Sequence, residues 1–285
     1  MECITSEKMF DKIEKIDSSL IQHGPNNDRV YLMKLAEKDA PVIIDKLHDL
    51  SLVKKYTKIF AKVPGKMVDE FIDNDFKKEA TIPKFFKGKE PAHFVSRFMG
   101  AARSFLSSAK KQKIKKNIEV ALTKKDQNGL SRPEAEFRAL EHEDAEQLVH
   151  LYEKTFKVYP FPIFDEQYIK KTMDENIDYY GAFMGDELVA ASSAEKDEEN
   201  KNAEMTDFAT LPKHRGKNLS YFLLKEMEEE MMAQDYKTLF TIARAESIGM
   251  NATFARTDYE FAGTLVNNTL IGEDIESMNV WYKNL

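Results

Sequence analysis

The sequence is poor in cysteine, in long apolar runs and in net positive charge, and each shortage excludes a class of protein. Cys3 is the single cysteine among 285 residues, so the chain cannot form an internal disulfide or a cysteine-based metal cluster. Residues Met1 to Asp17 are charged and lack the apolar stretch of a secretory signal peptide. No run approaches the roughly 20 apolar residues that span a bilayer. We therefore expect a cytoplasmic protein with no membrane partner and no bound metal.

The charge balance argues against a nucleic-acid partner. The chain has 42 Lys and Arg residues against 49 Asp and Glu residues, which gives a formal net charge of −7. A nucleic-acid-binding protein usually carries a basic excess on one surface. A hydrophobic fraction of 42% is typical of a globular protein, and the length is sufficient for two hydrophobic cores. The composition gives no oligomeric state.

Residues 1–106 are predicted to form a small N-terminal α/β domain. Alternating apolar residues predict strands, and apolar residues spaced by three or four predict helices. The predicted strands are Ser19–His23, Arg29–Leu35, Lys58–Val63 and Lys78–Phe86, and the predicted helices are Pro41–Leu50 and Lys66–Asp73.

Residues 107–133 form a basic connector. It carries seven lysines, at positions 110, 111, 113, 115, 116, 124 and 125. We interpret this segment as a helix with one solvated face, followed by a linker at Asp126–Gly129. Contact with an anionic surface is the alternative.

Residues 134–285 are predicted to form a second α/β domain. The predicted elements are strand Phe137–Leu140, helices Glu143–Phe156 and Asp165–Met173, strands Tyr179–Met184, Leu188–Glu195 and Ala203–Leu211, helix Leu219–Met232, strand Thr238–Ala243, helix Asn251–Thr257, and strands Thr264–Ile271 and Ser277–Tyr282. This order predicts an α/β (α+β) fold in which helices cover a mixed sheet.

The loop between Pro212 and the helix that begins near Leu219 is the most informative segment. It combines three cations with a glycine directly before a helix: Lys213, Arg215, Gly216 and Lys217. The first amides of a helix have no partner within the helix, and the helix dipole adds positive potential there. A glycine lets the backbone approach a phosphate closely. The loop is therefore a candidate anion site, with a basic turn that only caps a core helix as the alternative.

This loop resembles the acetyl-CoA loop of the GCN5-related N-acetyltransferase (GNAT) family. The family pattern is Gln or Arg, two residues, Gly, one residue, then Gly or Ala, and it falls here on Lys213, Gly216 and Asn218. Lys213 keeps the positive charge, and asparagine tolerates left-handed backbone better than most residues. The order of elements in residues 134–285 also matches the family, so the resemblance implies a GNAT fold with a mixed sheet.

The resemblance implies acetyl-CoA as cofactor and assigns residues to it. The strand before the loop separates from its neighbour in this family and pairs with the pantetheine arm. The implied cofactor contacts are Phe208, Ala209, Thr210, Leu211, Lys213, His214, Arg215, Gly216, Lys217, Asn218, Leu219, Ser220, Asn251 and Phe254. Phe254 stands where many members have a tyrosine that protonates the leaving thiolate. Water, another tyrosine or unassisted departure of the thiolate would then replace that acid.

Two carboxylates are candidates for the catalytic base. An ammonium with a pKa near 10.4 must lose a proton before it attacks, which costs roughly 4 to 5 kcal/mol at pH 7. Glu204 matches a strand position that holds a glutamate base in some GNAT enzymes. Asp207 lies three residues further on, so it points to the opposite face unless a bulge intervenes. Glu204 ranks first as base, and Asp207 is an alternative base or an anchor for the ammonium.

Longer stretches resemble the β-lysine N-acetyltransferase family, whose members make the compatible solute Nε-acetyl-β-lysine. These stretches are Ser19–Leu35, Lys58–Pro64, Tyr159–Ile163, Glu204–Pro212, Gly263–Ile271 and Glu276–Lys283. The implied partner is a small amine, β-lysine, acetylated on its ε-amine by direct attack of the neutral amine. Candidate substrate contacts are Arg244 for the carboxylate, Asn267 and Asn268 for other polar groups, and Tyr159 and Phe161 as an apolar wall.

Three alternatives remain open from the sequence. The acceptor could be another small amine, a polyamine or a protein lysine. The altered loop and the missing tyrosine could also mark a CoA-binding module without catalysis. In residues 1–106, the strand–helix–strand order resembles the later half of a GNAT fold without its basic glycine loop, and an unrelated small α/β domain is the alternative.

Overall fold

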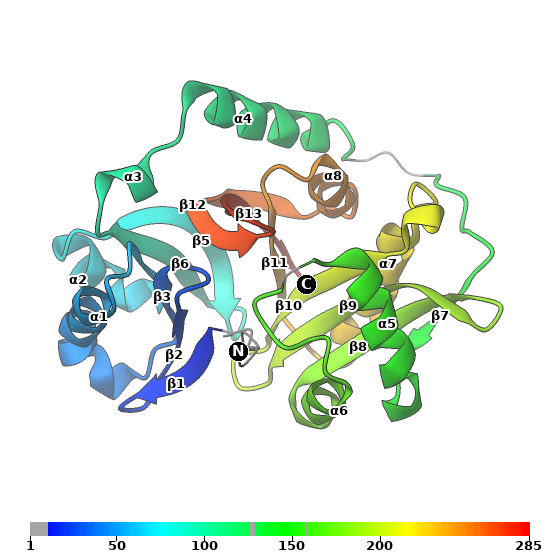
Figure 1. The fold of residues 1–285 in the computed structure, drawn as a ribbon, viewed down its shortest axis with the longest axis horizontal. Helices are drawn as coiled ribbons and strands as arrows, with labels where there is room; N and C mark the ends of the chain where they lie inside the picture. Colours follow the sequence, from blue (N-terminus) through cyan, green and yellow to red (C-terminus); the bar gives the residue numbers. More distant parts are fainter. Residues whose placement is uncertain (1–10, 126–128, 158) are drawn as a thin grey trace, which may run out of the picture.

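A computed structural model describes residues 11–125, 129–157 and 159–285, so Cys3 and residues 126–128 of the predicted linker lie outside the described residues. Thirteen strands form one continuous mixed sheet in the order β1-β2-β3-β4-β6-β5-β12-β13-β11-β10-β9-β8-β7. Strands from residues 1–106 make one half of this sheet and strands from residues 134–285 make the other (Figure 1). The predicted mixed sheet with covering helices is confirmed.

The N-terminal half contains six strands and three helices. Its strands are β1 Lys12–Ile16, β2 Ser19–Gly24, β3 Arg29–Lys34, β4 Lys58–Pro64, β5 Lys77–Phe86 and β6 Glu90–Phe98. Its helices are α1 Ala40–Lys54, α2 Val68–Asp73 and the short α3 Ala101–Ser104. β1 and β6 are two strands that the sequence did not predict.

The C-terminal half contains seven strands and four helices. Its strands are β7 Glu136–Ala139, β8 Ile177–Met184, β9 Glu187–Asp197, β10 Asn202–Thr210, β11 Thr238–Arg244, β12 Glu260–Ile271 and β13 Asp274–Asn284. Its helices are α5 Ala145–Thr155, α6 Glu166–Glu175, α7 Leu219–Ala233 and α8 Ile248–Arg256. α8 begins three residues before Asn251, so the expectation that Asn251 opens this helix is wrong.

The two halves repeat one topology. In the N-terminal half, β1, β2 and β3 are antiparallel neighbours, α1 leads to β4 parallel to β3, and β6 lies between β4 and β5. In the C-terminal half, β8, β9 and β10 are antiparallel, α7 leads to β11 parallel to β10, and β13 lies between β11 and β12. Each half therefore contains the same six-strand arrangement with a helix at the same crossover.

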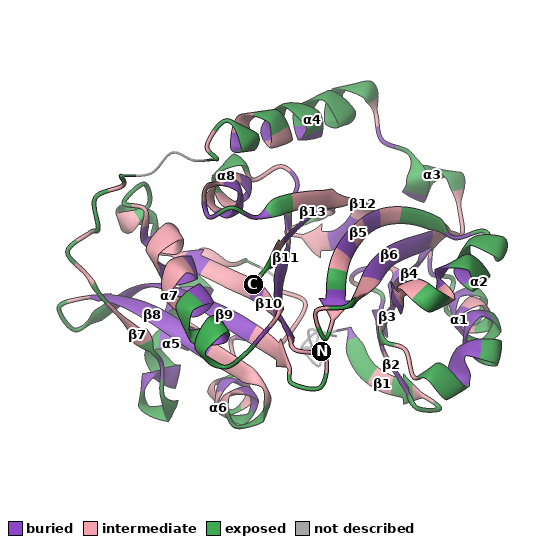
Figure 2. Ribbon diagram, turned by 180° about the vertical axis from the view of Figure 1, so that it is seen from behind, coloured by how far each residue is buried: buried purple, intermediate pink, exposed green. Residues whose placement is uncertain are grey.

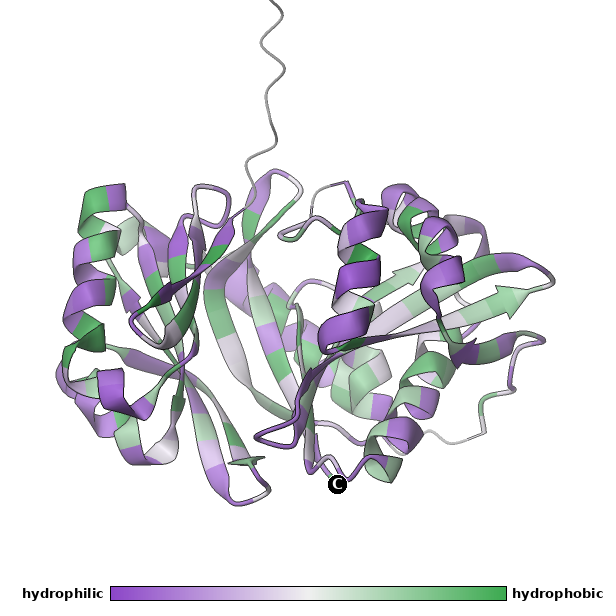
Figure 3. Cartoon of the chain, turned by 90° about the horizontal axis from the view of Figure 1, so that it is seen from below, coloured by the Kyte–Doolittle hydropathy of each residue, from purple (hydrophilic) through white to green (hydrophobic). Residues whose placement is uncertain are grey.

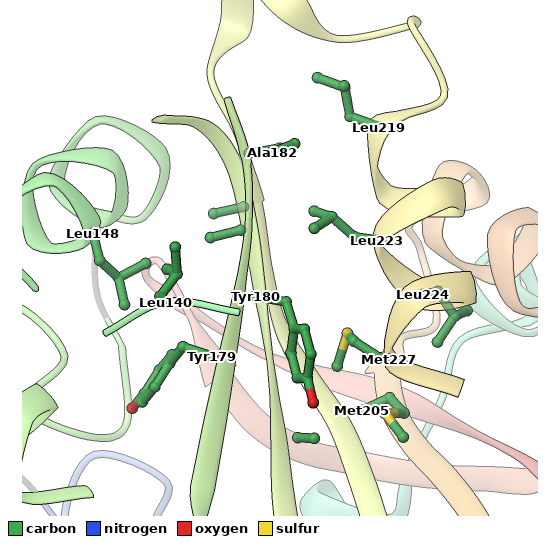
Figure 4. Packing of buried hydrophobic residues seen from close by; sticks show 14 of the residues in the cluster. Leu140, Leu148, Tyr179, Tyr180, Ala182, Met205, Leu219, Leu223, Leu224 and Met227 are labelled. Carbon is green, nitrogen blue, oxygen red and sulfur yellow. The ribbon is translucent and has the colours of Figure 1, made fainter. Parts of the chain in front are cut away.

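Apolar packing holds helices against both faces of the C-terminal half. Tyr180, Met205 and Met227 meet on the side of α7, whereas Tyr179 and Leu148 lie on the side of α5 (Figure 4). Buried residues follow these strands closely (Figure 2). Burying one large apolar side chain contributes about 1.5–3 kcal/mol, so this core fixes where β9 and β10 lie.

A separate apolar cluster lies where the halves meet, which we name the central cluster. It consists of Tyr31, Phe60, Ala80, Ile82, Phe85, Ala92, Phe94, Phe240, Leu265, Met278, Val280 and Tyr282. The two halves lie side by side (Figure 3), and β5 of the N-terminal half is the sheet neighbour of β12 of the C-terminal half. The pairing of β5 with β12 is a single bridge between Ala80 and Gly263. At Gly263, with φ +151°, an added Cβ would lie 2.1 Å from the carbonyl oxygen of Glu79, so only glycine permits this approach.

The basic connector forms α4, Ser108–Leu122, which packs on α8. Ile114 and Ala121 are buried on its inner side, while Lys110, Lys111, Lys113, Lys115 and Lys116 are exposed. Asn117 donates a hydrogen bond to the carbonyl of Ala245 at 3.1 Å. The helix has the solvated face that was predicted, and its other face is attached to the C-terminal half. Within the described ranges, no helix is both long and apolar enough to cross a lipid bilayer.

Candidate active site

β10 and β11 separate in the middle of the sheet. Their parallel pairing covers three residue pairs and ends at Glu204 and Phe240. Beyond that point β11 still pairs with β13 as far as Arg244, and β10 still pairs with β9. The facing edges of both strands therefore carry backbone groups without a strand partner. Unpaired edges of this kind can hydrogen-bond an extended chain laid between them.

A cavity of about 420 Å³ opens at this separation. It is lined by Thr155, Phe156, Lys157, Tyr159, Thr206, Asp207, Phe208, Thr241, Ile242, Ala243, Arg244, Ser247, Met250, Phe254, Ile271, Gly272 and Met278. The lining combines apolar side chains with polar groups from several elements, which is typical of a small-molecule site.

The loop between β10 and α7 presents a run of free amides. The backbone amides of Gly216, Lys217, Asn218, Leu219 and Ser220 have no backbone acceptor among the described residues, whereas His214 and Arg215 donate within the preceding turn. Asn218 caps α7 in the left-handed region, with φ +61°, as its tolerance for that backbone predicted. Gly216 also has a positive φ, +80°, and an added Cβ there would meet nothing within 4 Å. The loop is thus open toward solvent and suited to an anion.

The cations of this loop differ in their freedom. Lys213 is paired with Glu187 at 2.8 Å, and Arg215 donates to the carbonyl of Thr210 at 3.3 Å. Lys217 lies 3.2 Å from the Nδ1 atom of His214. The free amides and the cations of this loop fit a diphosphate. The ion pair with Glu187 partly neutralises Lys213.

A bulge turns Asp207 onto the same face as Glu204. The pairing of β10 with β9 shifts between Thr206 and Ala209, and Asp207 has φ +56°. Its carboxylate accepts hydrogen bonds from the hydroxyls of Ser193, at 2.6 Å, and Tyr159. Burial raises the pKa of Asp207, and these hydroxyls oppose that rise. The bulge is present, and it brings both carboxylates to one face of the sheet. Asp207 lines the cavity and is held by Ser193 and Tyr159, whereas Glu204 is not among the lining residues.

Glu204 lies at the point of separation, directly opposite Glu195 on β9. Burial raises the pKa of Glu204 most, and the like charge of Glu195 raises it further. Lys62 of the N-terminal half and the backbone amide of Ile242 act in the opposite direction. A carboxylate with a raised pKa is a stronger base than an ordinary one, which suits it to accept a proton from an amine.

Phe254 lies on the cavity wall with its ring edge-on to Phe208, at a centroid distance of 5.5 Å. It has no proton to give. The hydroxyl of Tyr259 is fully buried without a partner, so it is not available to the cavity. In the part of the chain that the structure describes, Tyr159 is the tyrosine on the cavity wall.

The remaining substrate candidates lie on the cavity wall, beside the cavity, or away from it. Tyr159 lines the cavity, and Phe161 packs against the core beside it without lining it. Arg244 lines the cavity, but its guanidinium makes a bidentate pair with Glu276 at 2.7 and 3.0 Å. Arg244 is therefore engaged in an ion pair within the fold.

Asn267 and Asn268 lie away from the cavity, contrary to the expectation. The Asn267 amide donates to the carbonyls of Arg103, at 2.8 Å, and Phe105, at 3.0 Å. Asn268 is 1% exposed and bonds Thr269. Both belong to an irregular stretch of β12 that contacts the N-terminal half, so they join the halves.

Asn251 is also a structural residue. Its Nδ2 donates to the carbonyls of Arg244 and Ser247, and its Oδ1 accepts from Asn279 and Trp281, each at 2.7 to 2.9 Å. All its side-chain groups are occupied within the fold. It can affect a ligand only by fixing the turn between β11 and α8.

Sequence reasoning missed Glu195, Ser193, Lys62 and Tyr31. Ser193 holds Asp207, and Glu195 and Lys62 set the charge around Glu204. Glu195 was predicted only as the last residue of a strand. Its position opposite Glu204 depends on strand register, which one sequence does not reveal. Among the described residues, no group of three or more His, Cys, Asp or Glu side chains is placed to hold a metal ion.

Comparison with known proteins agrees with this geometry. The profile of the family described as Acetyltransferase (GNAT) family matches residues 145–257. The chain is 39% identical over 279 residues to the beta-lysine N(6)-acetyltransferase of Methanococcus maripaludis, covering 96% of this chain and 99% of that protein. It is 30% identical over 259 residues to the beta-lysine N(6)-acetyltransferase of Methanosarcina mazei, covering 84% and 95%. The N-acetyltransferase YodP of Bacillus subtilis is 44% identical over 155 residues, covering 54% and 56%.

Proposed function

Since this chain belongs to the GNAT family of acetyltransferases and, within it, to the β-lysine N-acetyltransferase family, we propose that it acetylates the ε-amine of β-lysine to give Nε-acetyl-β-lysine. It is an N-acetyltransferase that uses acetyl-CoA. The observation that carries the choice of acceptor is the 39% identity to a beta-lysine N(6)-acetyltransferase, which covers both halves of the chain.

The chain offers a place for each part of the cofactor. The unpaired edges of β10 and β11 suit the extended pantetheine arm, and the free amides from Gly216 to Ser220 suit the diphosphate. Acetyl-CoA supplies an acetyl group that is activated as a thioester. The protein positions an amine against it and manages the protons.

Glu204 is our proposed base. It lies where β10 and β11 separate, next to the cavity, and its raised pKa lets it take a proton from the incoming ammonium. Asp207 accepts hydrogen bonds from the hydroxyls of Ser193 and Tyr159, so we assign it to holding Tyr159 and the local charge. A thiol has a pKa of about 8.5, so the leaving thiolate needs less assistance than an alkoxide would.

Substrate profiling tests the proposal. The purified protein is incubated with acetyl-CoA and β-lysine, α-lysine or spermidine, and thiol release and the acetylated products are measured. We expect kcat/KM to be largest for β-lysine. Turnover that is no faster with β-lysine than with α-lysine or spermidine would reject the proposed acceptor. CoA binding without thiol release on a broad amine panel would instead favour a binding module.

A further inference from the structure

Polar side chains from both halves share the inner face of the sheet beside the central cluster. Gln22 lies opposite Tyr31 in the pairing of β2 with β3, and Glu195 lies opposite Glu204 in the pairing of β9 with β10. Residues directly opposite on neighbouring strands point to the same face. Tyr31 belongs to the central cluster, as does Phe240, the parallel partner of Glu204. The two polar pairs occupy equivalent positions in the repeated topology.

Lys62 of β4 lies close enough to the glutamate pair for its charge to act on both carboxylates. Its ammonium is 5.4 Å from the ring centroid of Phe85 and 5.5 Å from that of Phe240, so a side chain of the N-terminal half reaches a ring of β11. Among the described residues it forms no hydrogen bond or ion pair. The rings hold the cation in place without neutralising it, because cation–π contacts leave its three donors free.

One of these polar groups is buried without a partner. The Gln22 side chain is 2% exposed, and its Nε2 atom has no hydrogen-bond partner among the described residues. A buried donor left unpaired is costly, so its presence on the face that carries Glu204 indicates a polar ligand.

The carboxylates on this face outnumber its cations. Glu195 and Glu204 lie opposite each other, and the charge of Asp207 acts on both. Lys62 is the cation that favours the ionised form of both glutamates. Ionising both would oppose like charges on one strand pair, so a second cation bound here would favour the ionised pair.

Building on the proposed function, we propose that this face binds the end of the acceptor that does not react. Glu195 binds the second ammonium of the substrate, and Lys62 binds its carboxylate. Gln22 and Tyr31 are placed to add neutral hydrogen bonds. The N-terminal half would then select acceptors that carry both an amine and a carboxylate beyond the reacting amine.

Two charge-removing variants combined with two truncated acceptors test this assignment. Putrescine retains both amines of β-lysine and lacks the carboxylate, whereas ε-aminocaproate retains the carboxylate and lacks the second amine. Lys62 and Glu195 also set the charge around Glu204, which affects every acceptor alike, so the readout is the ratio between acceptors. We expect Lys62→Met to lower kcat/KM for β-lysine about 30-fold more than it lowers kcat/KM for putrescine. We expect Glu195→Gln to lower kcat/KM for β-lysine more than for ε-aminocaproate, by a similar factor.

The control is Lys34→Met, which removes an exposed lysine of β3 that pairs with Glu199 at 2.9 Å. It should leave all three acceptors unaffected, and the CoA dissociation constant should be the same in every variant. The wild-type protein offers a test that needs no variant. Its kcat/KM for each truncated acceptor should be about 30-fold lower than its kcat/KM for β-lysine.

The outcomes separate the two proposals. A wild-type protein that does not prefer β-lysine contradicts the proposed function. A wild-type protein that prefers β-lysine, with variants that affect all three acceptors equally or none, contradicts the placement of the substrate on Glu195 and Lys62. Equal use of the truncated acceptors and β-lysine by the wild type contradicts that placement as well.

Discussion

The two halves have the same strand order but differ at the loop that follows the third strand of the repeat. In the C-terminal half, this loop presents free amides, Gly216 and three cations before α7. In the N-terminal half, it presents Glu37 and Asp39, and Pro41 near the start of α1 lacks an N–H altogether. Asp39 is occupied by Ser18 and Ser19, with which it forms hydrogen bonds of 2.9 and 2.8 Å. One topology thus gives a loop suited to an anion in one half and an acidic loop in the other.

A second difference lies at the strand position that holds Glu204. Its equivalent in the N-terminal half is Tyr31, and each is the third residue of the parallel ladder in its half. Tyr31 stacks on Phe60 at 4.5 Å, whereas Glu204 lies beside the cavity. The comparison shows that loop residues and single strand positions, and not the order of strands, decide which half carries out the chemistry.

Removal of the carboxylate of Glu204 is expected to have the largest effect. Glu204→Gln should lower kcat about 1000-fold, since a positioned general base contributes roughly 100- to 10,000-fold. Below its pKa, raised to about 8, Glu204 holds a proton and cannot accept another, so the wild-type rate should rise with pH through that region. The variant should lose this limb of the pH profile.

Asp207→Asn and the exposed Glu199→Gln are the comparison variants. A loss of the pH-dependent rise in rate in Asp207→Asn, with Glu204→Gln unaffected, would move the base to Asp207.

The pH dependence of stability offers an independent measurement. The pKa of Glu204 is higher in the folded protein than in the unfolded chain. Glu204 therefore contributes fully to the free energy of unfolding at pH values below its unfolded pKa, and this contribution is lost as pH rises through about 8. Glu204→Gln should therefore show a flatter dependence of unfolding free energy on pH.

Gly216→Val is expected to have the next largest effect. The residue has φ +80°, which a β-branched side chain does not adopt without strain, and its Cβ would enter the space that we assign to phosphate. We expect about a 100-fold rise in the CoA dissociation constant, measured by calorimetry. Gly185→Val is the matched control, because Gly185 has φ +61° and equally open surroundings in the β8–β9 turn. Unchanged CoA affinity in Gly216→Val would contradict the placement of the diphosphate at the loop from Gly216 to Ser220.

Gly263→Ala tests whether the halves depend on each other. The new methyl group would collide with the carbonyl of Glu79 at the single bridge between β5 and β12. We expect a loss of about 2 kcal/mol in the free energy of unfolding, together with reduced turnover on β-lysine. Gly100→Ala, which meets nothing within 4 Å, is the control. An unchanged free energy of unfolding in Gly263→Ala would show that the fold tolerates a wider spacing of β5 and β12 at this bridge.

Asp39→Asn should have the smallest effect on ligand binding. If the N-terminal half has no cofactor site, titration should give one CoA per chain before and after this substitution, with the same affinity. The hydrogen bond from Ser19 holds the pKa of Asp39 below its usual value, so its contribution to stability is lost as pH falls. A second CoA per chain in either protein would contradict the distinction between the halves.

Sequence periodicity predicted most helices and strands, but not the strand pairing that joins the two halves in one sheet. β4 was predicted almost to its ends, because Ile59, Ala61 and Val63 alternate along the sequence with Lys58, Phe60 and Lys62. β1 was not, because it is a largely exposed edge strand without an apolar alternation. β6 carries the buried polar residues His93 and Ser96, which lowered its apolar signal. That one sheet joins both halves depends on long-range pairing, which local patterns do not contain.

The site was predictable where its chemistry is local. Lys213, Gly216 and Asn218 lie within one loop, so the amide and dipole arguments could be made from sequence. The relation of Glu204 to Asp207 depended on a bulge, and the left-handed conformation of Asp207 is not marked by a glycine or proline. Arg244 was chosen for its charge, yet Glu276 on the neighbouring β13 occupies it. Distant partners of this kind become visible only once the strands are aligned.

The single bridge between β5 and β12 also has a consequence during synthesis of the chain. The ribosome completes β5 at Phe86, long before it reaches Glu260, where β12 begins. At about 5 to 20 residues per second, the edge of β5 waits roughly 10 to 35 s for its neighbour. During that time Lys58 lacks the Val266 carbonyl, which it finally contacts at 2.8 Å, and Arg29 lacks Asn268. The nascent N-terminal half therefore exposes an unpaired strand edge until the last hairpin emerges.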